Sequence, residues 1–135
     1  MQAQSQTRTR VILIIAVGAA FMWGLDLFVV NVAFDDIGQS LGVGTAAGPS
    51  MADLSWILNI YAVVYAALLV PLGRIADRYG RKNIFIGGLA LFVLASAARA
   101  LSGNVWTLVP FRGLQAAGAA ALTPTAAAAA VTPAA

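Results

Sequence analysis

The chain has 135 residues, of which 61% are hydrophobic and 10% are charged; its net charge is +3 and its mean hydropathy is +0.86. Soluble domains carry about 25% charged residues, and a fold of this length cannot hide so much apolar surface from water, which excludes an ordinary soluble domain and predicts an integral membrane protein. Cysteine and histidine are absent, so the sequence predicts no disulfide, no metal site and no cofactor, and offers no basis for enzymatic chemistry.

The start of the chain combines a polar tail with a long apolar run. Residues 1–10 are expected to be a disordered cytoplasmic tail, and residues 11–34 form the first apolar run. At 1.5 Å per residue this run can cross a hydrocarbon core about 30 Å thick. A secretory signal peptide is the alternative, but its apolar region would be shorter and would end at a small-residue cleavage site.

The rest of the chain alternates between connecting segments and three more apolar runs. Residues 35–50 are rich in Gly, Asp and Ser and predict a loop. The further spans are expected at about 54–72, 84–101 and 105–131. Period-two alternation is missing, so the fold class is an all-α membrane protein with four transmembrane helices.

The positions of Lys and Arg predict how these helices are oriented. Arg8 and Arg10 precede the first span, residues 35–53 contain no basic residue, and residues 73–82 contain four of the eight. Basic residues favour the cytoplasmic side, so both termini and the loop at 73–82 are expected in the cytoplasm and the protein in the cell membrane. The basic residues are thus orientation signals, and nucleic acid is not an expected partner.

Two ionisable residues interrupt the apolar runs. Asp26 lies in the first span and Arg112 in the fourth, at similar predicted depths in the outer half of the bilayer. A charge at the centre of a spanning helix costs about 2.5–3.5 kcal/mol by insertion scales and indicates a functional site. We expect both side chains to face one interior cavity and to interact; the alternatives are a purely structural pair or an Arg112 that reaches to the interface.

Three more polar or charged residues lie in the predicted spans near this pair. Gln115 follows Arg112 by three positions and shares its face. Asn31 could add a hydrogen-bonding group, but it lies about 140° around the helix from Asp26 and need not face the same space. Arg99, at the outer end of the third span, is expected to extend to the interface.

Small residues are concentrated in the third and fourth spans. They include Gly87 and Gly88, and then Gly113, Ala116, Ala117, Gly118, Ala119 and Ala120. Small side chains let helices approach closely in lipid, so these positions predict helix packing.

Three stretches resemble the major facilitator superfamily, in particular its drug:proton antiporter branch with fourteen spans. Residues 73–82 match the loop signature G-x-L-A-D-R-x-G-R-K, with Ile75 in the Leu position. Residues 25–35 resemble the first-span motif L-D-x-T-x-V-N-V-A-L-P, with Phe28 replacing Thr and Asp35 replacing Pro. Residues 112–120 resemble the fourth-span motif R-x-x-Q-G-x-G-A-A, with Ala116 replacing its first Gly.

The resemblance implies roles for particular residues. In the family the residue matching Arg112 takes part in proton coupling, and the one matching Asp26 handles substrate or protons. The residue matching Asp77 is a conformational latch against a helix from the second half of the protein. The implied substrate or proton pathway is Asp26, Asn31, Arg112 and Gln115, and the implied gating loop is Gly73, Asp77, Arg78, Gly80, Arg81 and Lys82.

The resemblance also implies a larger protein. Family members have twelve or fourteen spans in two halves, so residues 11–135 are expected to be a partial N-terminal domain, part of a six-helix bundle, and the missing C-terminal half an expected partner. The implied function is proton-coupled efflux of drug-like small molecules across the lipid bilayer, with this truncated chain not competent alone. The alternative is a small four-span membrane protein acting as an oligomeric scaffold or regulatory partner.

Overall fold

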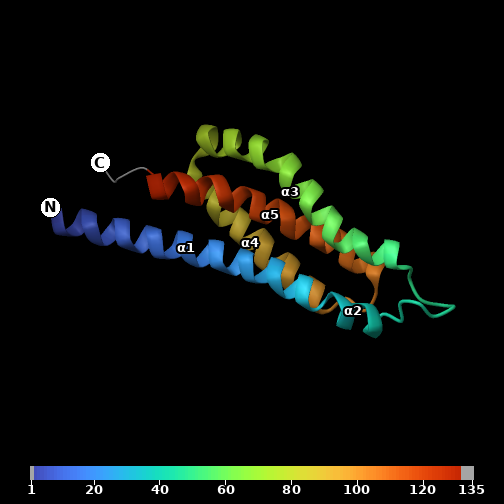
Figure 1. The fold of residues 1–135 in the computed structure, drawn as a ribbon. Helices are drawn as coiled ribbons and strands as arrows, with labels where there is room; N and C mark the ends of the chain where they lie inside the picture. The colour runs from blue at the N-terminus through green and yellow to red at the C-terminus, as the bar shows by residue number, and fades with distance from the viewer. Residues whose placement is uncertain (1, 132–135) are drawn as a thin grey trace.

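The computed structural model describes residues 2–131, and within this range the regular secondary structure is all helical, with no strand. Five helices occur in this range: α1 (Gln2–Val32), α2 (Phe34–Ser40), α3 (Met51–Tyr79), α4 (Arg81–Ala100) and α5 (Val105–Val131). The four long helices run alternately in opposite directions, and α5 lies among α1, α3 and α4 (Figure 1). The start of α1, the end of α5 and the α3–α4 turn therefore lie at one end of the bundle (Figure 1).

The first helix begins at Gln2 rather than at residue 11. The expectation of a disordered tail is therefore wrong for residues 2–10, which are helical. Gln, Ala and Arg are good helix formers, and the first glycine is Gly18. Extending an existing helix adds one hydrogen bond for each residue ordered, so the apolar run propagates its helix into the polar tail.

The predicted loop at 35–50 contains a short helix. α2 carries Asp35 and Asp36 in its first turn, where carboxylates interact favourably with the helix dipole. The irregular segment that follows includes Gly42, with a φ of 71°. It ends at a reciprocal cap, in which Asp53 N–H donates to Ser50 Oγ (3.2 Å) and Ser50 N–H donates to Asp53 Oδ2 (2.9 Å). This capping box sets the start of α3.

The basic segment at 73–82 is almost entirely helical rather than a loop. α3 continues to Tyr79 and α4 starts at Arg81, so the chain reverses direction at Gly80 alone. Gly80 has a φ of 98°, a conformation that side chains with a Cβ rarely adopt. One glycine thus replaces the longer connection that the charge pattern suggested.

Three helices are long and apolar enough to cross a membrane, by length and composition: Thr9–Val32, Met51–Tyr79 and Arg81–Ala100. The fourth predicted span forms α5 but is not among these three, so a fourth crossing and the cytoplasmic placement of both termini stay predictions. Arg112 and Gln115 lower the hydropathy of α5, and both are fully buried. A helix enclosed by its neighbours has less need of an apolar surface than one that faces lipid.

The tightest helix contact joins α4 to α5 through two glycines. A Cβ added to Gly88 would lie 2.7 Å from Ala121 Cβ and 3.0 Å from the Gly118 carbonyl oxygen. A Cβ added to Gly118 would lie 2.7 Å from the Gly88 carbonyl oxygen. The close packing predicted for the small residues is therefore confirmed at these two positions, whereas a Cβ on Gly87 would meet nothing within 4 Å.

Replacing the two neighbouring glycines of α4 tests this contact. Gly88→Ala should lower the free energy of unfolding by about 1–3 kcal/mol, because its methyl group overlaps α5. Gly87→Ala is the matched control and should be neutral or stabilising by up to about 1 kcal/mol, since alanine is the better helix former. Unfolding of the purified chain in micelles, followed by circular dichroism, measures both. Equal effects of the two substitutions would contradict this packing.

Candidate functional site

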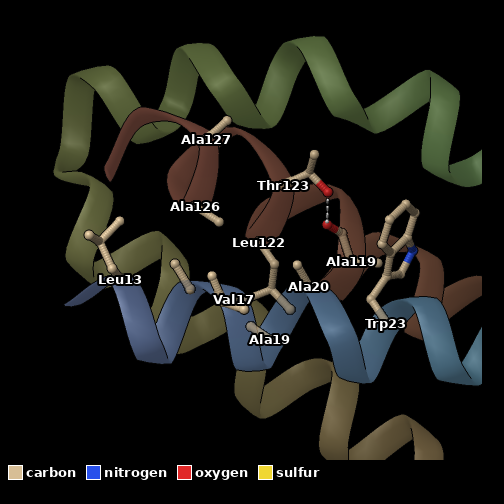
Figure 2. Close-up of a pocket in the computed structure, with 11 residues that line it drawn as sticks. Leu13, Val17, Ala19, Ala20, Trp23, Ala119, Leu122, Thr123, Ala126 and Ala127 are labelled. Atoms are coloured by element: carbon tan, nitrogen blue, oxygen red, sulfur yellow. Dashed lines mark hydrogen bonds between the residues drawn. The ribbon is translucent and has the colours of Figure 1, made fainter. Parts of the chain in front are cut away.

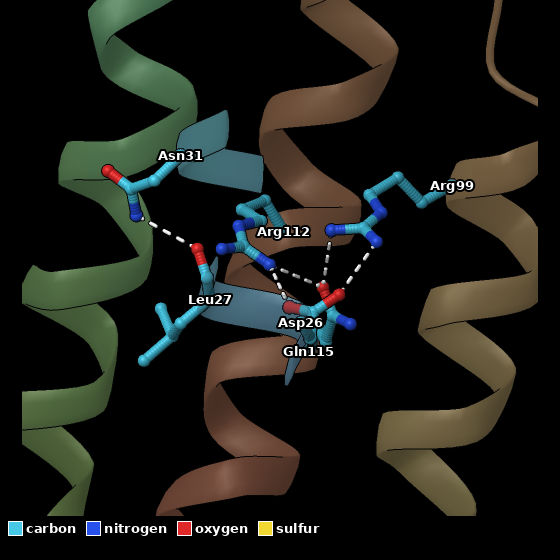
Figure 3. Close-up of polar contacts among 6 residues, drawn as sticks. All are labelled: Asp26, Leu27, Asn31, Arg99, Arg112 and Gln115. Atoms are coloured by element: carbon cyan, nitrogen blue, oxygen red, sulfur yellow. Dashed lines mark hydrogen bonds and ion pairs between the residues drawn. The ribbon is translucent and has the colours of Figure 1, made fainter. Parts of the chain in front are cut away.

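The site forms where α1, α4 and α5 converge on one carboxylate. Asp26 Oδ1 accepts a hydrogen bond from Arg99 Nη2 at 2.7 Å, and Asp26 Oδ2 is ion-paired with Arg112 Nη1 (Figure 3). The contact predicted between Asp26 and Arg112 is therefore present. A second arginine shares the same carboxylate, so one negative charge lies between two positive ones.

Helical periodicity explains why these side chains meet. On α1, Asp26 continues a stripe with Ala16, Ala19 and Val30, which are buried, and with Trp23. The spacings of three and four residues place this stripe on one helical face. On α5 a matching stripe follows Arg112, through buried Gln115, Ala119 and Leu122. The two stripes pack together, which places Asp26 and Arg112 next to each other.

Gln115 also contacts both arginines. Its Oε1 accepts hydrogen bonds from Arg99 Nη1 at 3.1 Å and from Arg112 Nη1 at 3.0 Å. A neutral acceptor between two guanidinium groups holds them near each other without adding charge. Gln115 is therefore part of the cluster, on the Arg112 face where helical spacing placed it. We call Asp26, Arg99, Arg112 and Gln115 the charged cluster.

Arg99 corrects a sequence-based expectation. It was expected to extend to the membrane interface, but its side chain turns inward to Asp26 and is 20% exposed. It follows buried Gly88, Phe92 and Ala95 at spacings of four, three and four residues, which is the buried face of α4. This spacing was the sequence signal that could have found it.

Asn31 lies outside the charged cluster. Its Nδ2 donates to the carbonyl oxygen of Leu27 at 2.8 Å, on an exposed part of α1 (Figure 3). The angular separation of Asn31 from Asp26 on the helix accounts for this placement. Asn31 therefore satisfies its own helix and does not contact Asp26 or Arg112.

A stack of aromatic rings packs against Arg112. The guanidinium carbon lies 4.2 Å from the centroid of the Tyr61 ring, a cation–π contact in an enclosed setting. Tyr61 stacks on Tyr65 with centroids 6.2 Å apart, and Tyr65 stacks on Trp23 at 5.6 Å. α1, α3 and α5 thus contribute to one aromatic and cationic layer.

An apolar groove runs along α1 and α5 away from this layer. Its volume is about 290 Å³, and Figure 2 shows Trp23 at one end of the residues that line it. The lining includes Leu13, Val17, Leu122 and Ala126. Ala119 also lines it, one helical turn from Gln115. The groove therefore approaches the charged cluster along the stripes that position it.

The predicted gating residues lie at the α3–α4 turn, near the end of the bundle where α1 starts (Figure 1). Asp77 and Arg81 form an ion pair across the turn at 3.0 Å, with side chains 65% and 51% exposed. The Arg78 guanidinium carbon lies 5.7 Å from the Tyr79 ring centroid, and Lys82 is exposed. A Cβ on Gly73 would meet Pro124 of α5 at an ordinary 3.6 Å. Asp77 is thus paired but accessible.

Metal binding finds no support in the part of the chain that the structure describes. No group of three or more Asp, Glu, His or Cys side chains within residues 2–131 could hold a metal ion. The interactions present at the charged cluster are ion pairs and hydrogen bonds.

Comparison with known proteins identifies relatives of this chain. A family model described as Major Facilitator Superfamily matches residues 13–133. The methylenomycin A resistance protein of Bacillus subtilis is 37% identical over 123 residues, covering 91% of this chain and 25% of that protein. The cephamycin export protein CmcT of Amycolatopsis lactamdurans is 37% identical over 112 residues, covering 83% and 22%. The tetracenomycin C resistance and export protein of Streptomyces glaucescens is 39% identical over 104 residues, covering 77% and 18%. The chain spans about a quarter or less of the length of these three relatives.

A double-mutant cycle measures the coupling at the charged cluster. Asp26→Asn should lower the free energy of unfolding by about 3–5 kcal/mol, because it leaves two enclosed guanidinium groups without a carboxylate. Arg112→Gln should cost less, since Asp26 keeps its ion pair with Arg99. The double variant should lose less than the sum, by at least about 1 kcal/mol.

The exposed pair provides the matched control for that cycle. Asp77→Asn and Arg81→Gln make the same chemical changes at the α3–α4 turn and should each alter stability by at most about 1 kcal/mol. Denaturant unfolding of the purified chain gives all these values. Strict additivity at Asp26 and Arg112 would show that their contact contributes no coupling.

Proposed function

Because this chain belongs to the Major Facilitator Superfamily, we propose that it acts in a secondary transporter that exports drug-like small molecules in exchange for protons. The observation that carries the proposal is the charged cluster, which encloses an ionisable carboxylate between arginines from two other helices. Intramembrane ionisable groups of this kind mark substrate and proton pathways. Relatives named for resistance to, or export of, methylenomycin A, cephamycin and tetracenomycin C favour export of small molecules over a scaffold role.

Asp26 is the proposed proton-binding group. It is the only acidic residue within the predicted spans. Protonation of its carboxylate would weaken the pairing with Arg99 and Arg112 at once, and so loosen α1 from α4 and α5. Deprotonation would restore both ion pairs. Proton binding would thereby bias the packing of α1, which is what coupling to alternating access requires.

The α3–α4 turn is the proposed inner gate. Asp77 and Arg81 are exposed and paired with each other, so either can exchange partners with a helix that docks at this end. Exposed ion pairs are worth about 0–1 kcal/mol, and such an exchange costs little. We place this turn and both termini in the cytoplasm, following the positions of the basic residues.

Cysteine labelling tests this orientation, and the absence of native cysteine makes it direct. Thr45→Cys, in the segment between α2 and α3, should react with a membrane-impermeant maleimide on intact cells. Lys82→Cys, at the start of α4, should react only after the membrane is permeabilised. Both native side chains are exposed, so access by solvent is matched. The reverse labelling pattern would overturn the orientation.

Export is tested with the complete product of the native gene, since the chain spans only part of its relatives' length. Its expression in a drug-sensitive bacterium should raise the inhibitory concentration of at least one antibiotic in a panel severalfold. A protonophore should abolish the gain, because export then lacks its driving force.

The role of Asp26 is tested in the same assay. Asp26→Asn should lower export at least about tenfold when the variant and the native protein are equally abundant in the membrane. The variant retains a hydrogen-bonding amide but cannot exchange protons. Asp36→Asn is the matched control at an exposed position of α2 and should leave resistance unchanged. Full export by the Asp26 variant would remove this residue from the proton pathway.

A further inference from the structure

The surroundings of Arg112 contain more hydrogen-bond donors than acceptors. Within residues 2–131, the buried side-chain atoms of the charged cluster without a hydrogen-bond partner are Arg112 Nε, Arg112 Nη2 and Gln115 Nε2. All three can only donate. Buried polar groups are normally paired, so an unpaired set of one kind indicates the chemistry that would complete it.

The net positive charge of the charged cluster also favours a ligand that accepts hydrogen bonds and carries negative charge. Two arginines against one aspartate leave one positive charge uncompensated. The other carboxylates are engaged elsewhere or lie outside the cluster: Asp53 caps α3, Asp77 pairs with Arg81, and Asp35 and Asp36 begin α2. The C-terminal end of α4 offsets part of the Arg99 charge through its dipole. Arg112 is fully buried and does not lie in the last turn of α5, so no helix dipole offsets its charge.

The groove supplies the second half of a binding site. Trp23 and Ala119 line it, and they lie one helical turn from Asp26 and Gln115 respectively. From there the lining is apolar along α1 and α5, except for Thr123, whose hydroxyl donates to the Ala119 carbonyl (Figure 2). A ligand with a charged head and an apolar body would match both parts.

We propose that the charged cluster and this groove bind a small apolar organic anion, with its carboxylate against Arg112 and Gln115 and its body between α1 and α5. The anion accepts hydrogen bonds from the unpaired donors and neutralises the surplus guanidinium charge. A cation with the same body would meet two arginines and a carboxylate that both arginines already engage. This inference rests on the proposed function, because it names the substrate class of that site.

Binding of three brominated probes to the purified chain in nanodiscs of zwitterionic lipid tests the charge preference. The probes are para-bromophenylbutanoate, its primary amide and para-bromophenylbutylammonium, which share one apolar body. Bromine quenches tryptophan fluorescence at contact, and Trp56→Phe with Trp106→Phe leaves Trp23 as the single tryptophan. Equilibrium dialysis with the native chain gives the same affinities without these substitutions, and empty nanodiscs correct for partition into lipid.

We expect the carboxylate to bind at least about tenfold more tightly than the amide and the ammonium probe, which corresponds to about 1.4 kcal/mol. Arg99→Gln removes the surplus charge without emptying the buried Arg112 site, and should reduce the carboxylate's advantage about tenfold while leaving the amide unchanged. Arg10→Gln, at an exposed position near the start of α1, is the matched control and should alter neither affinity. Equal binding of the three probes, preference for the ammonium probe, or no effect of Arg99→Gln would overturn the inference.

The two proposals fail in different assays. Loss of the carboxylate preference with drug export by the native gene product intact would overturn the anion site and leave the transport function standing. Carboxylate binding at Trp23 without export of any antibiotic would support the anion site and count against the export function.

Discussion

The rest of the structure depends on one carboxylate, that of Asp26, which pairs with two arginines inside an apolar bundle. Asp26, Arg99 and Arg112 come from three helices, and no two of the three lie on the same one. A buried charge without its partner costs several kcal/mol, so the carboxylate of α1 holds this helix to both α4 and α5. These ion pairs matter most for α1, because most of its apolar side chains face outward. Only 11% of the residues in its most apolar stretch are buried.

Close backbone packing is what brings the charges within reach of each other. Gly88 and Gly118 let α4 approach α5 until a single Cβ would not fit between them. Arg99 lies on the same face of α4 as Gly88, so this approach directs its guanidinium group to Asp26 and Gln115. The small residues and the charged cluster are therefore linked, since a wider α4–α5 spacing would leave Arg99 in lipid or at the interface.

The sequence predicted the elements of this arrangement better than their connections. Charges within apolar runs identified Asp26 and Arg112, because their insertion cost makes them visible without a structure. Arg99 was missed because its place near a helix end allows either an interfacial or an inward side chain. Its spacing from Gly88 favours the inward one only if Gly88 faces α5, which the packing of the two helices shows. The helical turn at Gly80 was missed because basic residues indicate a side of the membrane, not a backbone conformation. α2 was missed because its glycine and aspartates are typical of both a loop and a short helix.

The two ion-paired sites differ in what their environment allows them to do. The Asp77–Arg81 pair is exposed, so water can replace either partner and the pair can open at a cost of about 0–1 kcal/mol. The Asp26 pairs are enclosed, so opening them leaves a buried charge without its partner and costs several kcal/mol. Under the two proposals, the charged cluster would respond to a proton or an anionic ligand, whereas the turn at Gly80 would respond to the docking of another helix. Both responses would act on helices that pack against α5, so the close α4–α5 contact would be the element that links the two sites.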